Sequence, residues 1–559
     1  MRGAPTRPGA SVVLGLAFRL VLDSGVRERS CTEGDCSDAA GRSPTVALVI
    51  RGRLVPMADD PHVADAETAA FAGAVWVDDD GVVEAVTKGR RNGPAGYDDA
   101  PVVDVGTDLV LPGFIDLHSH LAYNTLPLWS VDDRERPFLH HNSWPGHRSY
   151  AASLTWPAYA LITAAPHELL AYVETKALVG GTTTIQGSPP HNRPRDGWLV
   201  RNAEDETFGT RNADLVYAST LTLDTTALAS RATAMRTRSA LFIYHCAEGQ
   251  RGSLAAREYT AAAHAGCLQR RFVAVHCNAV DPAVFQSWRD PGAVVWSPLS
   301  NLWLYGQTTD VPAALAAGVA VCLGSDWAPS GSRNVLGELK VARLVADSSG
   351  WDLSDLDLVR MVTSTPGDVL AQSWPHRVGR LQPGAAADLV VLRAGRRADP
   401  FHAVVHAREN DVRLVIVGGR LEYGTEQLMA PVVARTTAVD VAGERRALTL
   451  ASPDATTPWS WDEVVAGLEA VRREPKRSID AARALLANRP FAFHDPRAPL
   501  RLALDMPTGV VPVGGLPKDL DVIDIPPLEP LATDDAWLAS LAGRGYHGGL
   551  LDRLGEVFA

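Results

Sequence analysis

The sequence predicts an α/β protein: a (β/α)8 TIM barrel, a small β-sandwich formed from segments N- and C-terminal to the barrel, and a C-terminal extension. Two observations predict this fold. Between residues 111 and 374, short apolar runs alternate with helical segments, and the runs number eight when the one ending at residue 117 is included. Eight alternating β/α units are what such a barrel requires. On either side of this region lie short, turn-punctuated runs that are typical of antiparallel sheet.

The domain boundaries follow from the same patterns. Residues 1–44 form a polar leader that we expect to be partly disordered. Residues 45–110 and 375–425 build the composite β-sandwich, and residues 111–374 build the barrel. Residues 426–559 form an extension for which packing or oligomerisation is the default role.

The expected elements can be placed along the chain. The sheet strands are expected at residues 46–55, 74–78, 81–86, 102–105, 387–392 and 412–421. The barrel strands are expected at residues 109–117, 180–186, 197–201, 214–221, 240–246, 272–277, 293–297 and 319–326. Helices are expected at residues 166–179, 253–265, 311–317, 335–345 and 461–486, with a helical tail from residue 534. A G-x-G-x-x-G match at residues 543–548 follows no strand, so it does not indicate a dinucleotide site.

Charge and composition exclude several classes of protein. The net charge of −12 argues against a nucleic-acid surface. No window approaches the roughly 18 uninterrupted apolar residues of a membrane span. The six scattered cysteines include no C-x-x-C pair and suit free thiols in a reducing compartment, so we expect a cytoplasmic protein. The weak likeness of residues 1–22 to a signal peptide leaves secretion as the less favoured alternative.

Two histidines define the centre of the predicted site. His118 and His120 end the first barrel strand, and residues two apart on a strand face the same side. Two imidazoles there, with Asp116 two residues earlier, can bind one metal ion. The alternative is a pair of unrelated loop histidines.

Other polar residues lie at the ends of later barrel strands. His245, His276 and Asp326 end strands five, six and eight, and reactive groups of such barrels project from the C-terminal ends of the strands. Glu248, three residues after His245, can handle protons on a substrate beside a metal. Its alternative role is that of an acid favoured at a helix N-terminus.

These motifs together resemble the amidohydrolase superfamily, in the branch that includes atrazine chlorohydrolase, guanine deaminase and cytosine deaminase. The resemblance covers about residues 46–424 and rests on residues 112–120, 181–184, 245–248, 276, 297–301, 323–326 and 379–392. It implies that one divalent metal ion, zinc or iron, is held by His118, His120, His245 and Asp326. It also implies catalytic roles for Glu248, His276 and Asp326 in activating water and moving its proton. Strand four lacks the lysine of the binuclear members, which favours one metal ion.

The resemblance implies hydrolysis of a non-peptide carbon-nitrogen bond in a small cyclic or heterocyclic substrate. A deaminase and a cyclic-amide hydrolase are not distinguished, and a non-catalytic scaffold is the less favoured alternative. We expect a small-molecule substrate as the partner, with a homo-oligomer left open. The aromatic segment 121–150 either shapes the pocket or forms an exposed lid. Ser297 and Trp327 depart from the family pattern and leave the substrate undefined.

Overall fold

The computed structural model describes residues 47–58, 69–89, 93–131, 136–187, 199–204, 216–220, 222–375, 377–396, 398–450, 459–487, 517–543 and 549–558. The predicted leader and Cys31 and Cys36 lie outside them.

Strands from both ends of the chain form one nine-stranded sheet. The order is β16-β17-β15-β14-β13-β4-β1-β2-β3. Its members are β1 (Leu48–Leu54), β2 (Phe71–Val77), β3 (Val83–Lys88), β4 (Val102–Pro112), β13 (Leu389–Leu392), β14 (Val412–Val417), β15 (Arg420–Gly424), β16 (Thr437–Val441) and β17 (Glu444–Leu448). The predicted β structure from both flanks of the barrel is therefore confirmed, but as one continuous sheet, and it extends past residue 425 through β16 and β17.

Apolar side chains from the two halves share one core. Ile50 and Val75 from the N-terminal strands cluster with Leu389 and Leu414 from the later ones, and all four are fully buried. Burying such a side chain contributes about 1.5–3 kcal/mol relative to exposure. The two distant segments therefore stabilise each other.

All eight predicted parallel strands are present. They are β5 (Phe114–Asp116), β6 (Thr182–Ile185), β7 (Arg201–Asn202), β8 (Val216–Ser219), β9 (Leu241–Cys246), β10 (Phe272–His276), β11 (Ala293–Trp296) and β12 (Ala320–Leu323). The first three pair in one sheet and the last five in another. Asp326 N donates to His118 O at 2.8 Å, which brings the ends of the first and eighth strands together.

The predicted strand at residues 109–117 is in fact two strands. β4 ends at Pro112 in the nine-stranded sheet, and β5 begins at Phe114 in the barrel. Between them, Gly113 N donates to Asp388 O at 2.9 Å, and a Cβ on Gly113 would lie 2.2 Å from Thr183 Cγ2. Glycine is required here because the chain passes so close to β6.

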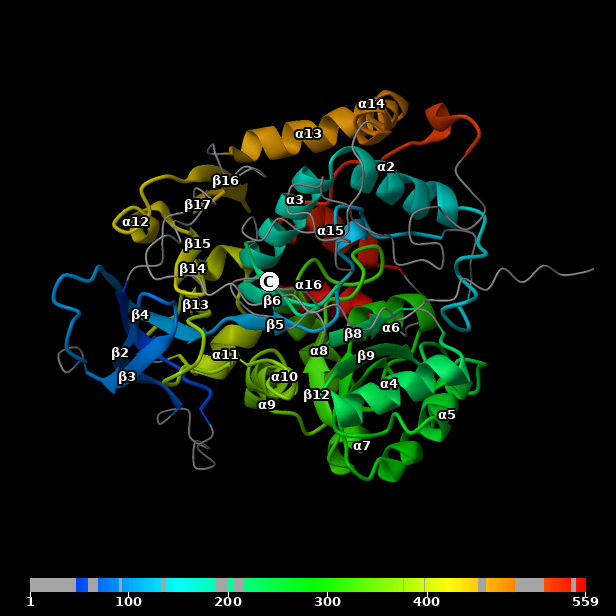
Figure 1. Cartoon of the computed structure of the whole chain (residues 1–559), viewed down its shortest axis with the longest axis horizontal. Coiled ribbons are helices and arrows are strands. Elements are labelled where there is room, and N and C mark those ends of the chain that lie inside the picture. The colour runs from blue at the N-terminus through cyan, green and yellow to red at the C-terminus, as the bar shows by residue number, and fades with distance from the viewer. Residues whose placement is uncertain are drawn as a thin grey trace, which may run out of the picture. The chain divides into compact units, whose positions relative to one another are not determined.

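In the part of the chain that the structure describes, α-helices separate β5 from β6, β8 from β9, β9 from β10 and β11 from β12, and further helices follow β12 (Figure 1). They are α2 (Trp156–Ala164), α3 (Pro166–Val179), α4 (Thr225–Thr237), α5 (Ala256–His264), α6 (Pro298–Tyr305), α7 (Val311–Ala316), α8 (Val335–Ser349), α9 (Asp355–Arg360) and α10 (Ser364–Leu370). Beyond the barrel, α11 (Pro400–Val405) and α12 (Glu426–Met429) accompany the sheet strands. The four helices predicted between residues 166 and 345 correspond to α3, α5, α7 and α8.

The C-terminal extension packs on the barrel. α13 (Trp461–Arg473) and α14 (Pro475–Ala487) lie beside α2 and α3 (Figure 1). Trp461 stacks on Tyr172 with ring centroids 5.2 Å apart. The single helix predicted for residues 461–486 is wrong, because Pro475 has no amide hydrogen to continue a helix from α13. The predicted tail contains α15 (Asp535–Leu541) and α16 (Leu554–Phe558), and residues 544–548 of the glycine motif lie outside the described residues.

Two further expectations concern membranes and thiols. Within the described ranges, no helix combines the length and apolarity needed to cross a membrane. Cys246, Cys267, Cys277 and Cys322 are buried and free. The cytoplasmic location stays a prediction.

Candidate metal centre and active site

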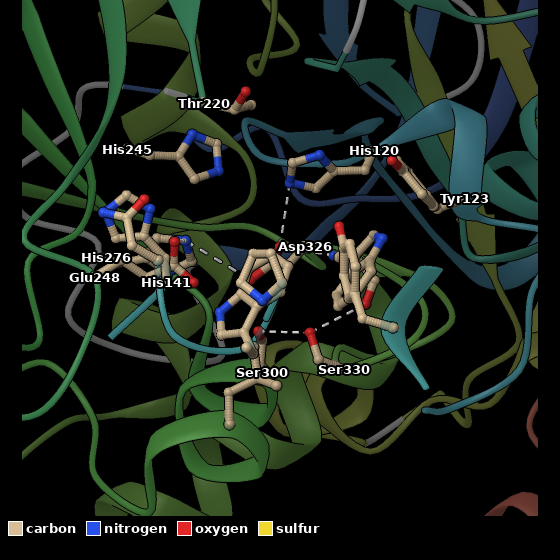
Figure 2. Close-up of a pocket in the computed structure, with 16 residues that line it drawn as sticks. His120, Tyr123, His141, Thr220, His245, Glu248, His276, Ser300, Asp326 and Ser330 are labelled. Carbon is tan, nitrogen blue, oxygen red and sulfur yellow. Dashed lines mark hydrogen bonds and ion pairs between the residues drawn. The ribbon is translucent and has the colours of Figure 1, made fainter. Parts of the chain in front are cut away.

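Every residue predicted for the site lies at one end of the parallel strands. His118 and His120 follow β5, His245 lies near the end of β9, His276 ends β10, and Asp326 follows β12. Figure 2 shows His120, His245, His276, Glu248 and Asp326 around one pocket. The fold therefore brings together, at the strand ends, side chains that are up to 208 positions apart, from 118 to 326. This is the arrangement expected for the C-terminal ends of barrel strands.

The potential metal-binding atoms converge. His118 Nε2 lies 2.9 Å from Asp326 Oδ1, and His120 Nε2 lies 3.4 Å from the same oxygen. The ring centroids of His118 and His245 are 4.5 Å apart. Two groups of three ligand atoms each lie within 4.8 Å of one another: His118, His245 and His276, and His118, His120 and Asp326.

These residues fit a divalent metal ion. Imidazole nitrogens and one carboxylate are a donor set that suits zinc or iron. Asp326 Oδ2 is buried and has no hydrogen-bond partner in the part of the chain that the structure describes. A buried carboxylate oxygen without a donor is costly, and an ion would satisfy it.

The hydrogen bond of His245 prepares its other nitrogen to bind metal. His245 Nδ1 lies 3.3 Å from the carbonyl oxygen of Ser219. A carbonyl oxygen can only accept, so Nδ1 carries the proton and Nε2 keeps its lone pair. Metal-binding histidines commonly have such a partner.

His276 has the opposite arrangement. Its Nδ1 lies 3.0 Å from Asn301 Nδ2, while Asn301 Oδ1 lies 3.3 Å from Thr308 Oγ1 and 3.5 Å from Thr309 Oγ1. These contacts orient the amide so that it donates to Nδ1, which places the ring proton of neutral His276 on Nε2. That nitrogen faces Glu248 Oε2 at 3.7 Å and Asp326 Oδ2 at 3.8 Å. The protonation pattern favours a hydrogen-bond donor over a metal ligand at this position.

Burial and the neighbouring imidazoles favour the neutral forms of His245 and His276. Burial and the neighbouring histidines hold the pKa of His245 well below its usual range, and burial lowers the pKa of His276 to about 3. Burial alone would raise the pKa of Asp326, but His118, His120 and His276 outweigh it and hold that pKa well below its usual range. Neutral imidazoles and an ionised carboxylate are the forms that bind metal.

Glu248 has the properties of a proton carrier. Its Oε1 accepts a 2.5 Å hydrogen bond from Tyr305 Oη, on the helix after β11. Burial raises the pKa of Glu248 to about 7. A carboxyl group with a pKa near neutrality can both give and take a proton at working pH.

Asp116 connects two of the strand ends that carry site residues. Its carboxylate accepts from the amides of His118 and Ser325, each at 3.1 Å, and from Ser325 Oγ at 2.5 Å. Burial raises the pKa of Asp116 to about 7. The side chain ties the end of β5 to the segment after β12, so its contacts favour positioning His118 and Asp326 over binding the ion itself.

The backbone at the site is strained. Ala247, His276, Cys277 and Asp326 all have positive φ values, between 55° and 70°. Non-glycine residues adopt this conformation at a cost of about 1–3 kcal/mol and cluster at functional sites. The surrounding hydrogen bonds therefore hold His276 and Asp326 in orientations that the backbone does not prefer.

An aromatic wall lines the same pocket, which has a volume of about 260 Å³. Trp144 stacks on Trp327 with centroids 5.2 Å apart, and Tyr123 meets Trp327 edge-on at 5.7 Å. Tyr123, Trp144 and Tyr150 come from segment 121–150, which therefore shapes the pocket, one of its two predicted roles. A second metal site at His140 and His141 is not found among the residues that the structure describes.

His141 belongs to segment 121–150, for which shaping the pocket was one of the two predicted roles. Sequence reasoning missed Tyr305 and the role of Asn301 as a partner of His276. Their positions depend on how α6 folds over the barrel, for which the sequence gives no periodic signal. Only residues 297–301 gave an indication, as part of the family resemblance.

Comparisons with known proteins confirm that resemblance. Residues 234–421 match the amidohydrolase family. The chain is 33% identical to 5'-deoxyadenosine deaminase from Methanopyrus kandleri over 167 residues, which cover 28% of this chain and 38% of the relative. It is 29% identical to S-triazine hydrolase from Gordonia rubripertincta over 211 residues, which cover 35% and 44%. The alignments thus span less than half of these two relatives.

A comparison with solved structures shows a similar fold over a longer part of the chain. A crystal structure of a variant of atrazine chlorohydrolase from Arthrobacter aurescens TC1, complexed with zinc and atraton, covers 76% of this chain and 99% of its own. The TM-score is 0.54 and the sequence identity 17%. This likeness supports the barrel architecture of the eight strands described above.

Proposed function

We propose that this chain, which matches the amidohydrolase family, is a metal-dependent hydrolase of a carbon-nitrogen bond in a small heterocycle. The observation that supports this most is the convergence of four histidines and Asp326 beside Glu248, at the strand ends of the barrel. His118, His120, His245 and Asp326 hold one divalent ion, zinc or iron. The relatives named above are a deaminase and a triazine hydrolase, and both names agree with this class of reaction.

A bound divalent ion supplies a more acidic water, lowering its pKa from ~15.7 toward ~7. The chain's own residues manage the proton. His276, protonated on Nε2, donates toward the reacting oxygen, and the second carboxylate oxygen of Asp326 accepts the proton of the water. Glu248 transfers a proton to a ring nitrogen or to the leaving group, as its pKa of about 7 allows.

The pocket suits a flat, mostly apolar molecule. Trp144 and Trp327 line the pocket together with Glu248 and His276, and aromatic rings bind well against aromatic side chains. A volume of about 260 Å³ accommodates a small ring system. Both a deaminase and a cyclic-amide hydrolase are compatible with these groups.

Metal analysis combined with a substrate panel tests the proposal. The purified protein is expected to hold one zinc or iron ion per chain, and His118→Ala is expected to lose it. Release of ammonia from purines, pyrimidines and triazines indicates a deaminase, and ring-opened product from lactams indicates an amide hydrolase. Glu248→Gln should retain the ion and lose turnover by about 10²–10⁴-fold. A wild type without stoichiometric metal would instead indicate a non-catalytic scaffold.

The remaining expectations are part of the proposal. The partner is a small molecule, the protein is cytoplasmic, and a homo-oligomer is left open. Gel filtration with light scattering measures the oligomeric state directly.

A further inference from the structure

One pocket residue, His141, has no role in the proposed reaction. It lies in segment 121–150, and its backbone is fixed against the loop after β9. His140 bridges Gly249, His141 N donates to Glu248 O at 3.2 Å, and Gln250 N donates to Leu139 O at 2.8 Å. These bonds hold the His141 side chain at a set place in the pocket (Figure 2).

A buried carboxylate fixes the tautomer of His141. Its Nε2 lies 2.7 Å from Glu258 Oε1, and the two side chains are only 8% and 6% exposed. Glu258 also accepts from Thr222 Oγ1 at 2.7 Å and from Ala247 N at 2.9 Å, so its position is well determined. Because an ionised carboxylate only accepts, Nε2 carries a proton.

The second ring nitrogen of His141 is available to a ligand. Nδ1 has no hydrogen-bond partner among the described residues, while the residue lines the pocket. Burial would lower the pKa of His141, but the hydrogen bond to Glu258 and the charges of Glu248 and Glu258 outweigh it and raise the pKa. The 2.7 Å contact with the buried carboxylate of Glu258 favours the imidazolium form, in which Nδ1 also carries a proton and can donate to a ligand.

We propose that His141 binds an oxygen acceptor on the substrate, so that the pocket selects heterocycles bearing a ring carbonyl or carboxylate over their amino-substituted counterparts. This inference rests on the proposed function of the pocket as a heterocycle site. Glu258 acts as the counter-ion that keeps the imidazole charged and oriented. An amino group in place of the oxygen would set donor against donor, which adds discrimination by repulsion.

The expected discrimination follows from the strength of the contact. A hydrogen bond to a charged, desolvated group favours the matching ligand by roughly tenfold to a hundredfold in affinity. His141 lies beside Glu248, because its backbone amide donates to the backbone carbonyl of Glu248. The selected oxygen is therefore expected near the ring atom that receives the proton from Glu248.

Two pairs of probes differ only in the group that His141 would recognise: ammeline against melamine, and isoguanine against adenine. In each pair the first compound has a ring carbonyl where the second has an amino group or hydrogen. Dissociation constants are measured by isothermal titration calorimetry with the metal-loaded protein, and product formation is followed in parallel. We expect the oxo compound to bind at least tenfold more tightly in at least one pair.

Variants separate recognition from structure. His141→Phe should abolish the preference by weakening binding of the oxo compound, while the affinity of the second compound of the pair stays within about threefold. The double variant His141→Phe/Glu258→Gln removes both partners of the buried pair and serves if the single variant folds poorly. His140→Phe is the matched control, because His140 does not line the pocket; it should keep the preference.

Three results would overturn the inference: no preference in the wild type, no binding of any probe, or an equal loss of both members of a pair in His141→Phe. The preference is measured as binding and not as turnover. A protein that binds oxo compounds selectively but releases no ammonia would therefore refute the proposed hydrolase while supporting the role of His141. A protein that turns over the probes but binds both members of each pair equally would do the reverse.

Discussion

Asn301 donates its side-chain N–H to Nδ1 of His276 across 3.0 Å, and this single bond decides which ring nitrogen of His276 carries the proton. With Nδ1 accepting, the proton of the neutral ring lies on Nε2, toward Glu248 and Asp326. His245, with Nδ1 bonded to a carbonyl oxygen, has the reverse protonation. Two histidines at the ends of neighbouring strands are thereby given different tasks.

Asn301→Asp should reverse the tautomer of His276. A carboxylate beside Nδ1 accepts a proton from it, so the neutral ring loses the proton on Nε2 that faces the site. We expect turnover to fall by about 10²–10⁴-fold, the scale seen when a catalytic histidine holds the wrong tautomer, while metal content stays at the wild-type value. Ammonia release on any substrate found in the panel, together with elemental analysis, measures both. Unchanged turnover would remove Asn301 from this role.

His245→Ala and His276→Ala should differ in metal content. Loss of a ligand is expected to reduce bound metal sharply, so His245→Ala should retain little zinc or iron after dialysis. His276→Ala should keep its ion because its Nε2 is protonated in the wild type. His264→Ala, at the end of α5, is the control for histidine loss elsewhere. Equal metal loss in both site variants would show that His276 is a ligand as well.

The buried carboxyl group of Glu338 should make the stability of the protein depend on pH. Burial raises its pKa to about 8, whereas the unfolded chain has a pKa near 4.5. Between pH 4.5 and 8 the folded state binds the extra proton, so this group stabilises the protein below pH 4.5 and the stabilisation is lost as pH rises through 8. Glu338→Gln removes the titration and keeps an oxygen for the 2.8 Å bond from Leu299 N.

Chemical unfolding at pH 5 and pH 8 measures this effect. The wild type should lose stability relative to Glu338→Gln by an amount on the order of 3 kcal/mol over that range. Parallel curves for the two proteins would show that Glu338 is ionised in the folded state throughout.

Gly113→Ala should destabilise the junction between the nine-stranded sheet and the barrel. The new Cβ would lie 2.2 Å from Thr183 Cγ2, a distance that requires β5 or β6 to move. We expect a loss of about 1–3 kcal/mol, as for other overpacked positions. Gly395→Ala is the matched control, because its Cβ would meet nothing within 4 Å, and it should change stability by about 0.5 kcal/mol or less. Thermal unfolding of both variants provides the comparison.

The parts of the fold with a strong sequence period were predictable. The eight barrel strands are apolar runs bounded by turns, and each predicted range overlaps the observed strand. Two boundaries failed for local reasons. Gly113 moves the chain from one sheet to another within an apolar run, and Pro475 interrupts a helical pattern that otherwise continues.

The residues of the candidate site also fall into a predictable and an unpredictable group. His118, His120, His245, His276 and Asp326 could be identified because strand ends of a barrel meet at one face. Tyr305, Asn301 and Glu258 could not, because they reach the site from helices whose register over the barrel depends on tertiary packing. His141 fell within segment 121–150, which was expected either to shape the pocket or to form an exposed lid, but its contact with Glu258, 117 positions away, could not be predicted.

The pocket is assembled from two sources, and this division has an evolutionary consequence. The metal-binding side chains come from strand ends, whereas three of the four aromatic residues of the wall, together with His141, come from segment 121–150. Insertions, deletions or recombination within that one segment can exchange the recognised molecule without disturbing the hydrolytic centre. Descendants of such a chain would therefore change their substrate more readily than the reaction that they catalyse.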